Sequence, residues 1–331
     1  MEEVRWGIIG VGDVCEVKSG PAFQQVKDSR LIAVMRRDGV KAADFAQRHH
    51  VPKWYDDADK LINDPEVNAI YIATPPNVHE YYTAKAAAAG KPVYVEKPMA
   101  RNYQECERMV EQCAKRKVPL FIAYYRRRLP NYLKIQSLLA EKAIGDIRYV
   151  SITLNKTMEP DIVGAAGQVG NWRTDPEIAG GGYFFDLASH QLDILDFLLG
   201  PIEQAHGYAS NQAGLYRGED ITTGSWYHKS GVMGQGTWCF ATGKSADEET
   251  IMIIGSKGHI AFSCFGDQSM TLTVDGKEPV NFEFDIPVNI QQPLIESIVG
   301  ELTNNGGTCP SKGDSAVRTG WVMDQICKRV D

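Results

Sequence analysis

The chain lacks several patterns that would define its class at once. Its seven cysteines are scattered over 331 residues and form no Cys-x-x-Cys pair, so we expect reduced thiols rather than a disulfide framework. No apolar run reaches the roughly 18 residues of a membrane-spanning helix, and the acidic N-terminus does not resemble a signal peptide. The longest basic run is Arg126-Arg127-Arg128, in a chain of formal net charge −7. These absences argue against a membrane or nucleic-acid partner and favour a cytoplasmic protein.

The length and composition fit a globular chain with two domains. A chain of 331 residues exceeds one ordinary core, and its 43% hydrophobic and 23% charged residues are typical of globular proteins. We expect a dinucleotide-binding domain over residues 1–123 and a substrate and oligomerisation domain over residues 124–331. The last helix of the second domain could pack back on the first.

The first domain begins with the pattern of a dinucleotide-binding fold. The apolar run Val4–Ile9 leads into Gly10-Val-Gly12, where Gly10 permits a tight turn and Gly12 lets the backbone approach a pyrophosphate. Further strands are expected at residues 30–35, 69–73, 92–95 and 119–123, with helices at 41–50, 81–89 and 103–117. This alternation predicts an α/β fold whose N-terminal domain is a Rossmann doubly wound parallel sheet.

The end of the second expected strand bears on the choice of cofactor. A carboxylate at this point would bind the ribose hydroxyls of NAD, but the chain has Arg36-Arg37 there, with Asp38 displaced. Two guanidinium groups suit the 2′-phosphate of NADP. The sequence therefore predicts NADP, with NAD possible, unless both arginines merely lie on a solvated surface.

From residue 124 on, consecutive strands replace the alternation. After a helix at 131–141, strands are expected at residues 147–156, 202–211, 221–228, 231–240, 249–255, 258–263, 270–274 and 280–284, and helices at 294–302 and 315–327. Tight turns between such strands predict an α+β domain with a large, mainly antiparallel sheet. Helices must cover one face, and a second subunit would cover the other. We therefore expect a homodimer or homotetramer that forms through this sheet.

The stretch 180–193 contains the residue types expected of a proton-transfer site. Three glycines permit a sharp turn and close packing, and a helix-like run then places Asp186 and His190 four residues apart. On an α-helix that spacing stacks two side chains on one face. A histidine can move a proton near neutral pH, although His190 could also be an ordinary helix histidine. Asp193, three residues further on, is more plausibly orienting or structural than catalytic.

Four motifs in this order resemble one family. They are the glycine loop, Thr74-Pro-Pro-Asn-Val-His79, Glu96-Lys97-Pro98 and Gly-Gly-Gly…Asp186-x-x-x-His190. Together they resemble the glucose–fructose oxidoreductase / inositol dehydrogenase / rhizopine-catabolism (Gfo/Idh/MocA) family over essentially the whole chain. The resemblance implies that Lys97, Asp186 and His190 are catalytic.

The same resemblance extends the predicted site to cofactor and substrate contacts. With the glycine loop and the arginine pair, the residues expected at the cofactor are Gly10, Val11, Gly12, Asp13, Val14, Arg36, Arg37, Thr74, Pro75, Asn77, His79, Glu96, Lys97, Trp172 and Arg173. Those expected at the substrate are Arg126, Arg127, Asp186 and His190. No metal is expected, because His49-His50 is typical of a helix end or surface and the other histidines lack the spacing of ligands.

The resemblance implies an oxidoreductase that acts on a small polyol or keto-sugar, and the arginine pair predicts that it depends on NADP. Hydride would pass between nicotinamide and a secondary alcohol or ketone of a sugar, cyclitol or similar polyol. Two alternatives stay open at this point: an NAD-dependent glycosidase of the same family, and a non-catalytic sensor of NADP redox state. The sequence leaves open the substrate, the direction of reaction, and whether Asp186 orients His190 or binds substrate.

Overall fold

The structure is a computed structural model that describes residues 1–157 and 172–328. The chain divides into two compact units: Met1–Arg128 with Pro287–Val317, and Leu129–Ile286 with the residues from Arg318 on. The segment Pro287–Val317, which the sequence places in the second domain, therefore clusters with the first unit. None of the described helices combines the length and apolar composition that crossing a membrane requires.

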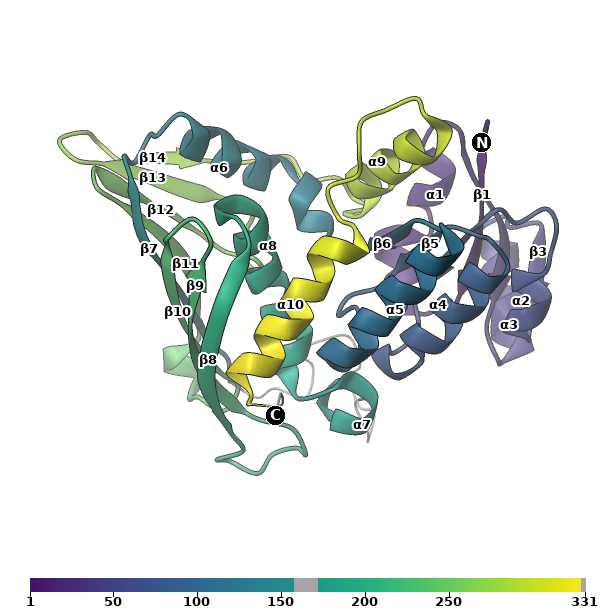
Figure 1. Cartoon of the computed structure of the whole chain (residues 1–331), viewed down its shortest axis with the longest axis horizontal. Helices are drawn as coiled ribbons and strands as arrows, with labels where there is room; N and C mark the ends of the chain where they lie inside the picture. The colour runs from purple at the N-terminus through teal and green to yellow at the C-terminus, as the bar shows by residue number, and fades with distance from the viewer. Residues whose placement is uncertain (158–171, 329–331) are drawn as a thin grey trace. The chain divides into compact units, whose positions relative to one another are not determined.

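The first unit is built on a six-stranded parallel sheet, as the alternation of strands and helices predicts (Figure 1). The strand order is β3-β2-β1-β4-β5-β6. Strands β2 and β3 are added on one side of β1 and strands β4 to β6 on the other, so the order of addition switches between β1 and β4. Ligands of such sheets bind at this switch point, beyond the carboxyl ends of the strands. The strands are β1 (Val4–Ile9), β2 (Ser29–Met35), β3 (Lys53–Tyr55), β4 (Ala69–Ile72), β5 (Val93–Val95) and β6 (Leu120–Ile122).

Helices bury both faces of this sheet, which explains its nearly continuous apolar strands. They are α1 (Ala22–Gln25), α2 (Gly39–Arg48), α3 (Ala58–Ile62), α4 (His79–Ala88), α5 (Tyr103–Arg116) and α9 (Gln292–Thr303). On one face four aromatic rings pack together, those of Trp6, Phe23, Tyr71 and Tyr94. Helix α9 returns from near the end of the chain to lie beside α1 (Figure 1).

The second unit is built on an eight-stranded sheet of order β14-β13-β12-β11-β7-β10-β9-β8. Its neighbours are antiparallel except for β7 and β10, which run parallel, so the expected mainly antiparallel sheet is confirmed. The strands are β7 (Ile147–Asn155), β8 (Ile202–Ser210), β9 (Ile221–His228), β10 (Met233–Cys239), β11 (Glu248–Gly255), β12 (Gly258–Phe262), β13 (Met270–Val274) and β14 (Val280–Phe282). Its helices are α6 (Pro130–Ala140), α7 (Pro176–Ala179), α8 (Ser189–Leu199) and the part of α10 (Gly313–Ile326) that begins at Arg318.

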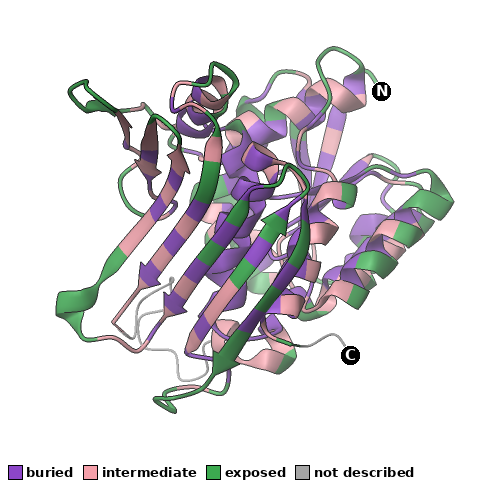
Figure 2. Ribbon diagram, turned by 60° about the vertical axis from the view of Figure 1, so that its left-hand side comes forward, coloured by how far each residue is buried: buried purple, intermediate pink, exposed green. Residues whose placement is uncertain are grey.

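The two faces of the second sheet differ in burial (Figure 2). On the inner face the ring of Tyr132 in α6 packs against Phe262, and the indole of Trp238 bonds Gln191 of α8. The outer face carries exposed Tyr149, Tyr227 and Met233. Alternation along the strands therefore separates a covered face from one that is open in the single chain.

Candidate functional site

The glycine loop after β1 forms a tight turn with open space above it. Gly10 has φ +96°, and a Cβ there would lie only 2.8 Å from Cγ2 of Thr74. The N–H of Gly10 donates to the carbonyl oxygen of Met35 at 2.9 Å. At Gly12, by contrast, a Cβ would meet nothing within 4 Å. A ligand can therefore approach the main chain at Gly12, as a dinucleotide pyrophosphate requires.

The residues that follow the loop form a π-helical turn, Cys15–Ser19. Asp13 is exposed and Val14 is half-buried, so both keep surface next to the loop. Cys15 occupies the position of the usual third glycine. Its thiol is fully buried, and this burial raises the pKa of Cys15 to about 12. The thiol therefore stays neutral and serves close packing.

The two arginines at the end of β2 lie in different surroundings. Nη1 of Arg36 donates to the carbonyl oxygen of Val11 at 3.0 Å, which ties this side chain to the glycine loop. Arg37 is exposed. The nearby carboxylate of Asp38 accepts from the N–H of Lys41 at 3.2 Å and so caps α2. Asp38, the carboxylate nearest the end of β2, therefore serves as the cap of α2.

The loop after β4 carries four residues expected at the cofactor. Pro75 and Asn77 keep surface, while the hydroxyl oxygen of Thr74 is buried and has no hydrogen-bond partner among the described residues. The ring of His79 lies between the carbonyl oxygens of Thr74, at 2.7 Å, and Met99, at 3.1 Å. His79 has no exposed surface, and burial lowers its pKa. It therefore holds the loop in place, and its direct contact with the cofactor stays a prediction.

Glu96, at the carboxyl end of β5, is held by a buried hydrogen-bond network. The hydroxyl of Tyr71 and the side-chain amide of Gln291 both donate to Oε1 of Glu96, at 2.5 and 2.6 Å. Gln291 also accepts from the hydroxyl of Tyr94 at 2.7 Å. Burial and the charge of Glu96 raise the pKa of Tyr71 well above its usual range. The carboxylate of Glu96 therefore anchors the strand end, and the next residue, Lys97, keeps part of its surface.

The arginines after β6, which are expected at the substrate, are both buried. Nη1 of Arg127 donates to the carbonyl oxygen of Pro310 at 2.7 Å and to the hydroxyl of Ser315 at 2.8 Å. Its guanidinium thus fixes the returning C-terminal segment to the first unit. Arg126 donates to the hydroxyl of Tyr125 at 3.2 Å and is likewise buried. Both guanidinium groups are buried, and their contact with the substrate stays a prediction.

Asp186 and His190 lie on a segment that is not a regular α-helix. Asp186 belongs to a π-helical turn, Phe184–Ala188, and His190 to the first turn of α8. The two side chains thus lie in successive helical segments, and their stacking on one face stays a prediction. Both side chains are buried, at 6% and 4% exposure. They keep little surface, as proton-transfer groups shielded from bulk water do.

Arg173 contacts Asp186, a pairing that the sequence did not indicate. Its Nε lies 3.7 Å from Oδ2 of Asp186, and its guanidinium stacks over the ring of Trp172 at 4.4 Å. Trp172 and Arg173 were expected at the cofactor, and that contact stays a prediction. Within the second unit, this pair supplies a positive charge to the buried carboxylate of Asp186.

The three glycines before the π-helical turn permit a close approach by the loop between β8 and β9. The N–H of Gly182 donates to Oε1 of the buried Glu219 at 2.9 Å. A Cβ on Gly182 would lie 2.3 Å from the carbonyl oxygen of Glu219, so a larger residue would displace the loop. The glycines therefore position the turn that carries Asp186 through a contact within the second unit.

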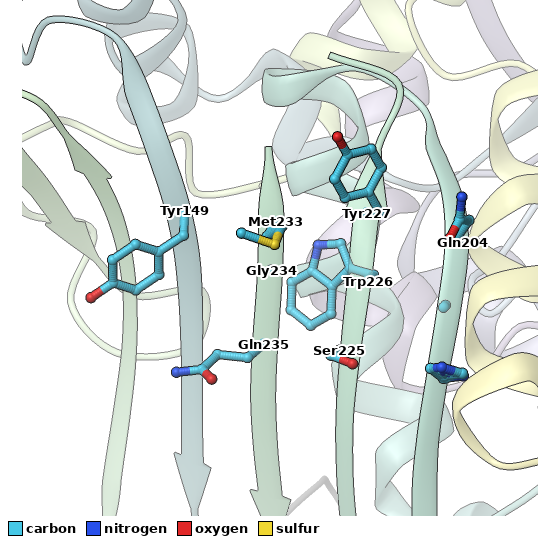
Figure 3. A pocket seen from close by; sticks show the side chains of 10 residues that line it. Tyr149, Gln204, Ser225, Trp226, Tyr227, Met233, Gly234 and Gln235 are labelled. Atoms are coloured by element: carbon cyan, nitrogen blue, oxygen red, sulfur yellow. The ribbon is translucent and has the colours of Figure 1, made fainter. Parts of the chain in front are cut away.

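A separate hollow lies on the outer face of the second sheet (Figure 3). It has a volume of about 550 Å³, and its lining includes Tyr149, Tyr227, Met233, Gln204 and Gln235. None of the residues expected at the cofactor or substrate lines it. Its mixture of aromatic, thioether and amide groups is typical of the surfaces that proteins use for contacts with other proteins.

Comparison with known proteins assigns both parts of the chain to domains of one oxidoreductase family. Residues 4–124 match the oxidoreductase family with an NAD-binding Rossmann fold, and residues 132–261 match the GFO/IDH/MocA C-terminal domain. An oxidoreductase of Formosa agariphila, named P35, is 40% identical over 326 residues, which is 98% of each chain. The trans-1,2-dihydrobenzene-1,2-diol dehydrogenase of Xenopus tropicalis is 32% identical over 151 residues, 44% of each chain.

A solved structure with the same fold is that of levoglucosan dehydrogenase in complex with NADH and levoglucosan. The TM-score is 0.85, and the alignment covers 98% of this chain and 96% of that one. Sequence identity is 19%, so this likeness concerns the fold alone.

Proposed function

The chain belongs to the Gfo/Idh/MocA family of NAD(P)-binding oxidoreductases, and on that premise we propose a particular reaction for it. The proposed reaction is NADP-dependent hydride transfer between nicotinamide and a secondary alcohol or ketone of a sugar, cyclitol or related polyol. The observation that carries the proposal is the glycine loop at the switch point between β1 and β4, with open space above Gly12.

The residues around this loop fit a dinucleotide. The exposed main chain at Gly12 would receive the pyrophosphate, and the buried Thr74 hydroxyl, which lacks a partner among the described residues, offers a hydrogen bond to a ligand at the same edge. When bound, the nicotinamide supplies the hydride acceptor for oxidation or the hydride donor for reduction. Asp13, Pro75, Asn77 and Lys97 keep surface on neighbouring loops and are proposed cofactor contacts.

The surroundings of Arg36 and Arg37 support NADP over NAD. Asp38 is occupied as the cap of α2, and Arg36 is fixed to the glycine loop through Val11. The exposed Arg37 can then bind a 2′-phosphate by charge-assisted hydrogen bonds. A carboxylate that would repel this phosphate is lacking from the described end of β2 except for the capping Asp38.

We assign the proton transfer to His190 and stabilisation of the reacting oxygen to Lys97. During oxidation the substrate carbon gives up its hydrogen with the bonding electron pair, and the hydroxyl proton passes to the ring of His190. The ammonium group of Lys97 donates a hydrogen bond to the same oxygen and stabilises the negative charge that develops on it. Reduction reverses these steps. Asp186, paired with Arg173, would orient His190 or bind a neighbouring hydroxyl.

The names of two similar proteins support a hydroxylated substrate. One is named for a dihydrobenzene diol, and another was solved with levoglucosan. Both compounds carry secondary hydroxyl groups, which agrees with the proposed reaction at a secondary alcohol.

We further propose that the chain forms a homodimer or homotetramer through the outer face of the second sheet. This face carries exposed Tyr149, Tyr227, Tyr208 and Met233, at 42%, 41%, 73% and 59% exposure. An aromatic and apolar surface of this kind on a sheet is typical of an interface between subunits. The hollow of Figure 3 would be part of that interface.

The proposed reaction is tested by measuring NADPH oxidation with ketoses, anhydro-keto sugars and inosose-type ketones, with NADH in parallel. His190→Ala and Lys97→Ala should each lower turnover by about 10²–10⁴-fold. NADPH binding, followed by its fluorescence, should persist in His190→Ala and weaken only partly in Lys97→Ala, which removes one of several proposed cofactor contacts. Lys115→Ala is the matched control, because Lys115 is exposed on α5 and pairs only loosely with Glu111. Turnover near that of the wild type in either test variant would refute the assignment.

A further inference from the structure

The loop between β12 and β13 places an aromatic side chain beside His190. This loop, the 263–269 loop, carries Phe265, which is half-buried. The rings of Phe265 and His190 are 6.0 Å apart between centroids and meet at 64°, in an edge-to-face arrangement. An aromatic ring therefore borders the group that we assign to proton transfer.

A single carboxylate holds this loop and the His190 helix together. Oε1 of Glu249, at the start of β11, accepts from the N–H of Cys264 at 2.7 Å and from the side-chain amide of Gln191 at 3.0 Å. Oε2 accepts from the N–H of Phe265 at 2.8 Å. Hydrogen bonds to an ionised acceptor are stronger than neutral ones. Glu249 thus fixes the backbone of Phe265 relative to the residue that follows His190.

Gln191 is itself fixed from the other side. Its side-chain oxygen accepts from the indole N–H of Trp238 at 2.7 Å, and both residues are fully buried. The far end of the 263–269 loop is tied to α6, because Asn131 donates to the side chain of Gln268 at 3.3 Å. The position of Phe265 next to His190 is therefore set by the core of the second unit and by both ends of its loop.

We propose that Phe265, positioned by Glu249, is a specificity-determining residue that selects cyclic substrates. The inference rests on the proposed function, since it takes His190 as the group at the reacting carbon. A hydroxylated ring presents C–H groups on a face that can pack against an aromatic ring, while its hydroxyls stay available for hydrogen bonds. An open-chain polyol lacks a fixed apolar face and must lose rotational freedom to present one.

The test compares cyclic and open-chain probes on Phe265→Ala, Phe265→Tyr and wild-type protein. The probes are myo-inositol and levoglucosan as rings and sorbitol and xylitol as chains, each with NADP⁺ and NAD⁺. For Phe265→Ala we expect kcat/KM to fall roughly tenfold or more for the ring probes and to change less than about threefold for the chains. Phe265→Tyr, which keeps the aromatic face, should retain the ring preference.

Glu249→Gln tests the positioning residue separately. A glutamine can accept a hydrogen bond at only one of the two side-chain positions, so at least one of the three bonds to Gln191, Cys264 and Phe265 must be lost. We expect KM for the ring probes to rise while kcat changes little, because His190 itself is unaltered.

Phe284→Ala is the matched control for Phe265→Ala. Phe284 is a half-buried aromatic that stacks on Phe282 and does not contact His190.

Binding is also measured without turnover, by saturation-transfer NMR of the ring C–H protons. A wild-type protein that shows no preference for rings, or that binds no ring probe, overturns the proposal. So does a Phe265→Ala variant in which the ring and chain probes lose kcat/KM in equal proportion. Ring binding that depends on Phe265 in a protein that turns over no probe would refute the proposed reaction while leaving this inference standing.

Discussion

Replacing Gln291 with leucine tests the buried network that holds Glu96 at the carboxyl end of β5. Gln291 is fully buried and reaches the sheet from the returning segment Pro287–Val317. It donates to Glu96 at 2.6 Å and accepts from the hydroxyl of Tyr94 at 2.7 Å. Leucine has a similar volume, so the variant removes two hydrogen bonds and creates almost no cavity.

The expected loss of stability follows from the two bonds. A hydrogen bond to a charged group contributes about 1.5–3 kcal/mol, and a neutral one about 0.5–1.5 kcal/mol. The carboxylate of Glu96 stays buried after the substitution and keeps the donation from Tyr71, so its desolvation is only partly uncompensated. We therefore expect the free energy of unfolding of the first unit to fall by about 3 kcal/mol.

Urea unfolding followed by circular dichroism measures this change, and a fall in Tm of roughly 2–4 °C per kcal/mol should accompany it. Gln292→Leu is the matched control, because its side chain bonds Glu296 in solvent at 3.0 Å. It should cost less than about 0.5 kcal/mol.

A double-mutant cycle with Glu96→Gln isolates the contribution of the charge. Without the carboxylate, the loss of the Gln291 amide should cost less, which gives a coupling energy of about 1–2 kcal/mol. A Gln291→Leu variant as stable as Gln292→Leu, or a cycle with no coupling, would show that the network does not hold the strand end.

Three further outcomes are expected. Arg37→Ser should raise the Kd of NADP⁺ at least roughly tenfold with little effect on NAD⁺, as fluorescence titration would show; equal effects on both cofactors would remove Arg37 from the phosphate site. Hydrogen bonds from Arg48 lower the pKa of Glu16 to about 2. The stability that this pair contributes is therefore fully present above the pKa of the unfolded chain, about 4.3, and is lost as the pH falls towards about 2. Arg48→Ala should therefore flatten the pH dependence of Tm over this window, and an unchanged slope would contradict the pairing. Tyr227→Glu with Met233→Glu should reduce the mass in sedimentation equilibrium to that of a smaller assembly; an unchanged mass would exclude the outer face as the interface.

The architecture of both sheets could be predicted from the sequence because hydrophobic patterns encode it directly. Buried parallel strands such as Ala69–Ile72 are continuous apolar runs, and alternation along β9 marks a sheet with one covered face. Strand β3 was missed, because Lys53–Tyr55 has three residues, none of them buried, and lies at the edge of its sheet. Short edge strands carry too little pattern to be recognised.

Local motifs of the site were predictable, whereas their long-range partners were not. The tight turn at Gly10 and the capping by Asp38 depend on neighbouring residues. Gln291, however, meets Glu96 across 195 residues, and no pattern in either segment indicates the other. Arg127 likewise bonds the carbonyl oxygen of Pro310 across 183 residues, a contact that no local pattern indicates.

The pair Asp186–His190 has a neighbour that the motif does not indicate. The turn that carries Asp186 is π-helical. Oδ2 of Asp186 lies 3.7 Å from Arg173, whose guanidinium stacks on Trp172. A buried carboxylate next to a guanidinium is more favourable than a carboxylate alone, because an unpaired buried charge is costly. The contact therefore gives Asp186 a structural task that neither alternative from the sequence included: it fixes the segment expected at the cofactor to the turn that leads into the His190 helix.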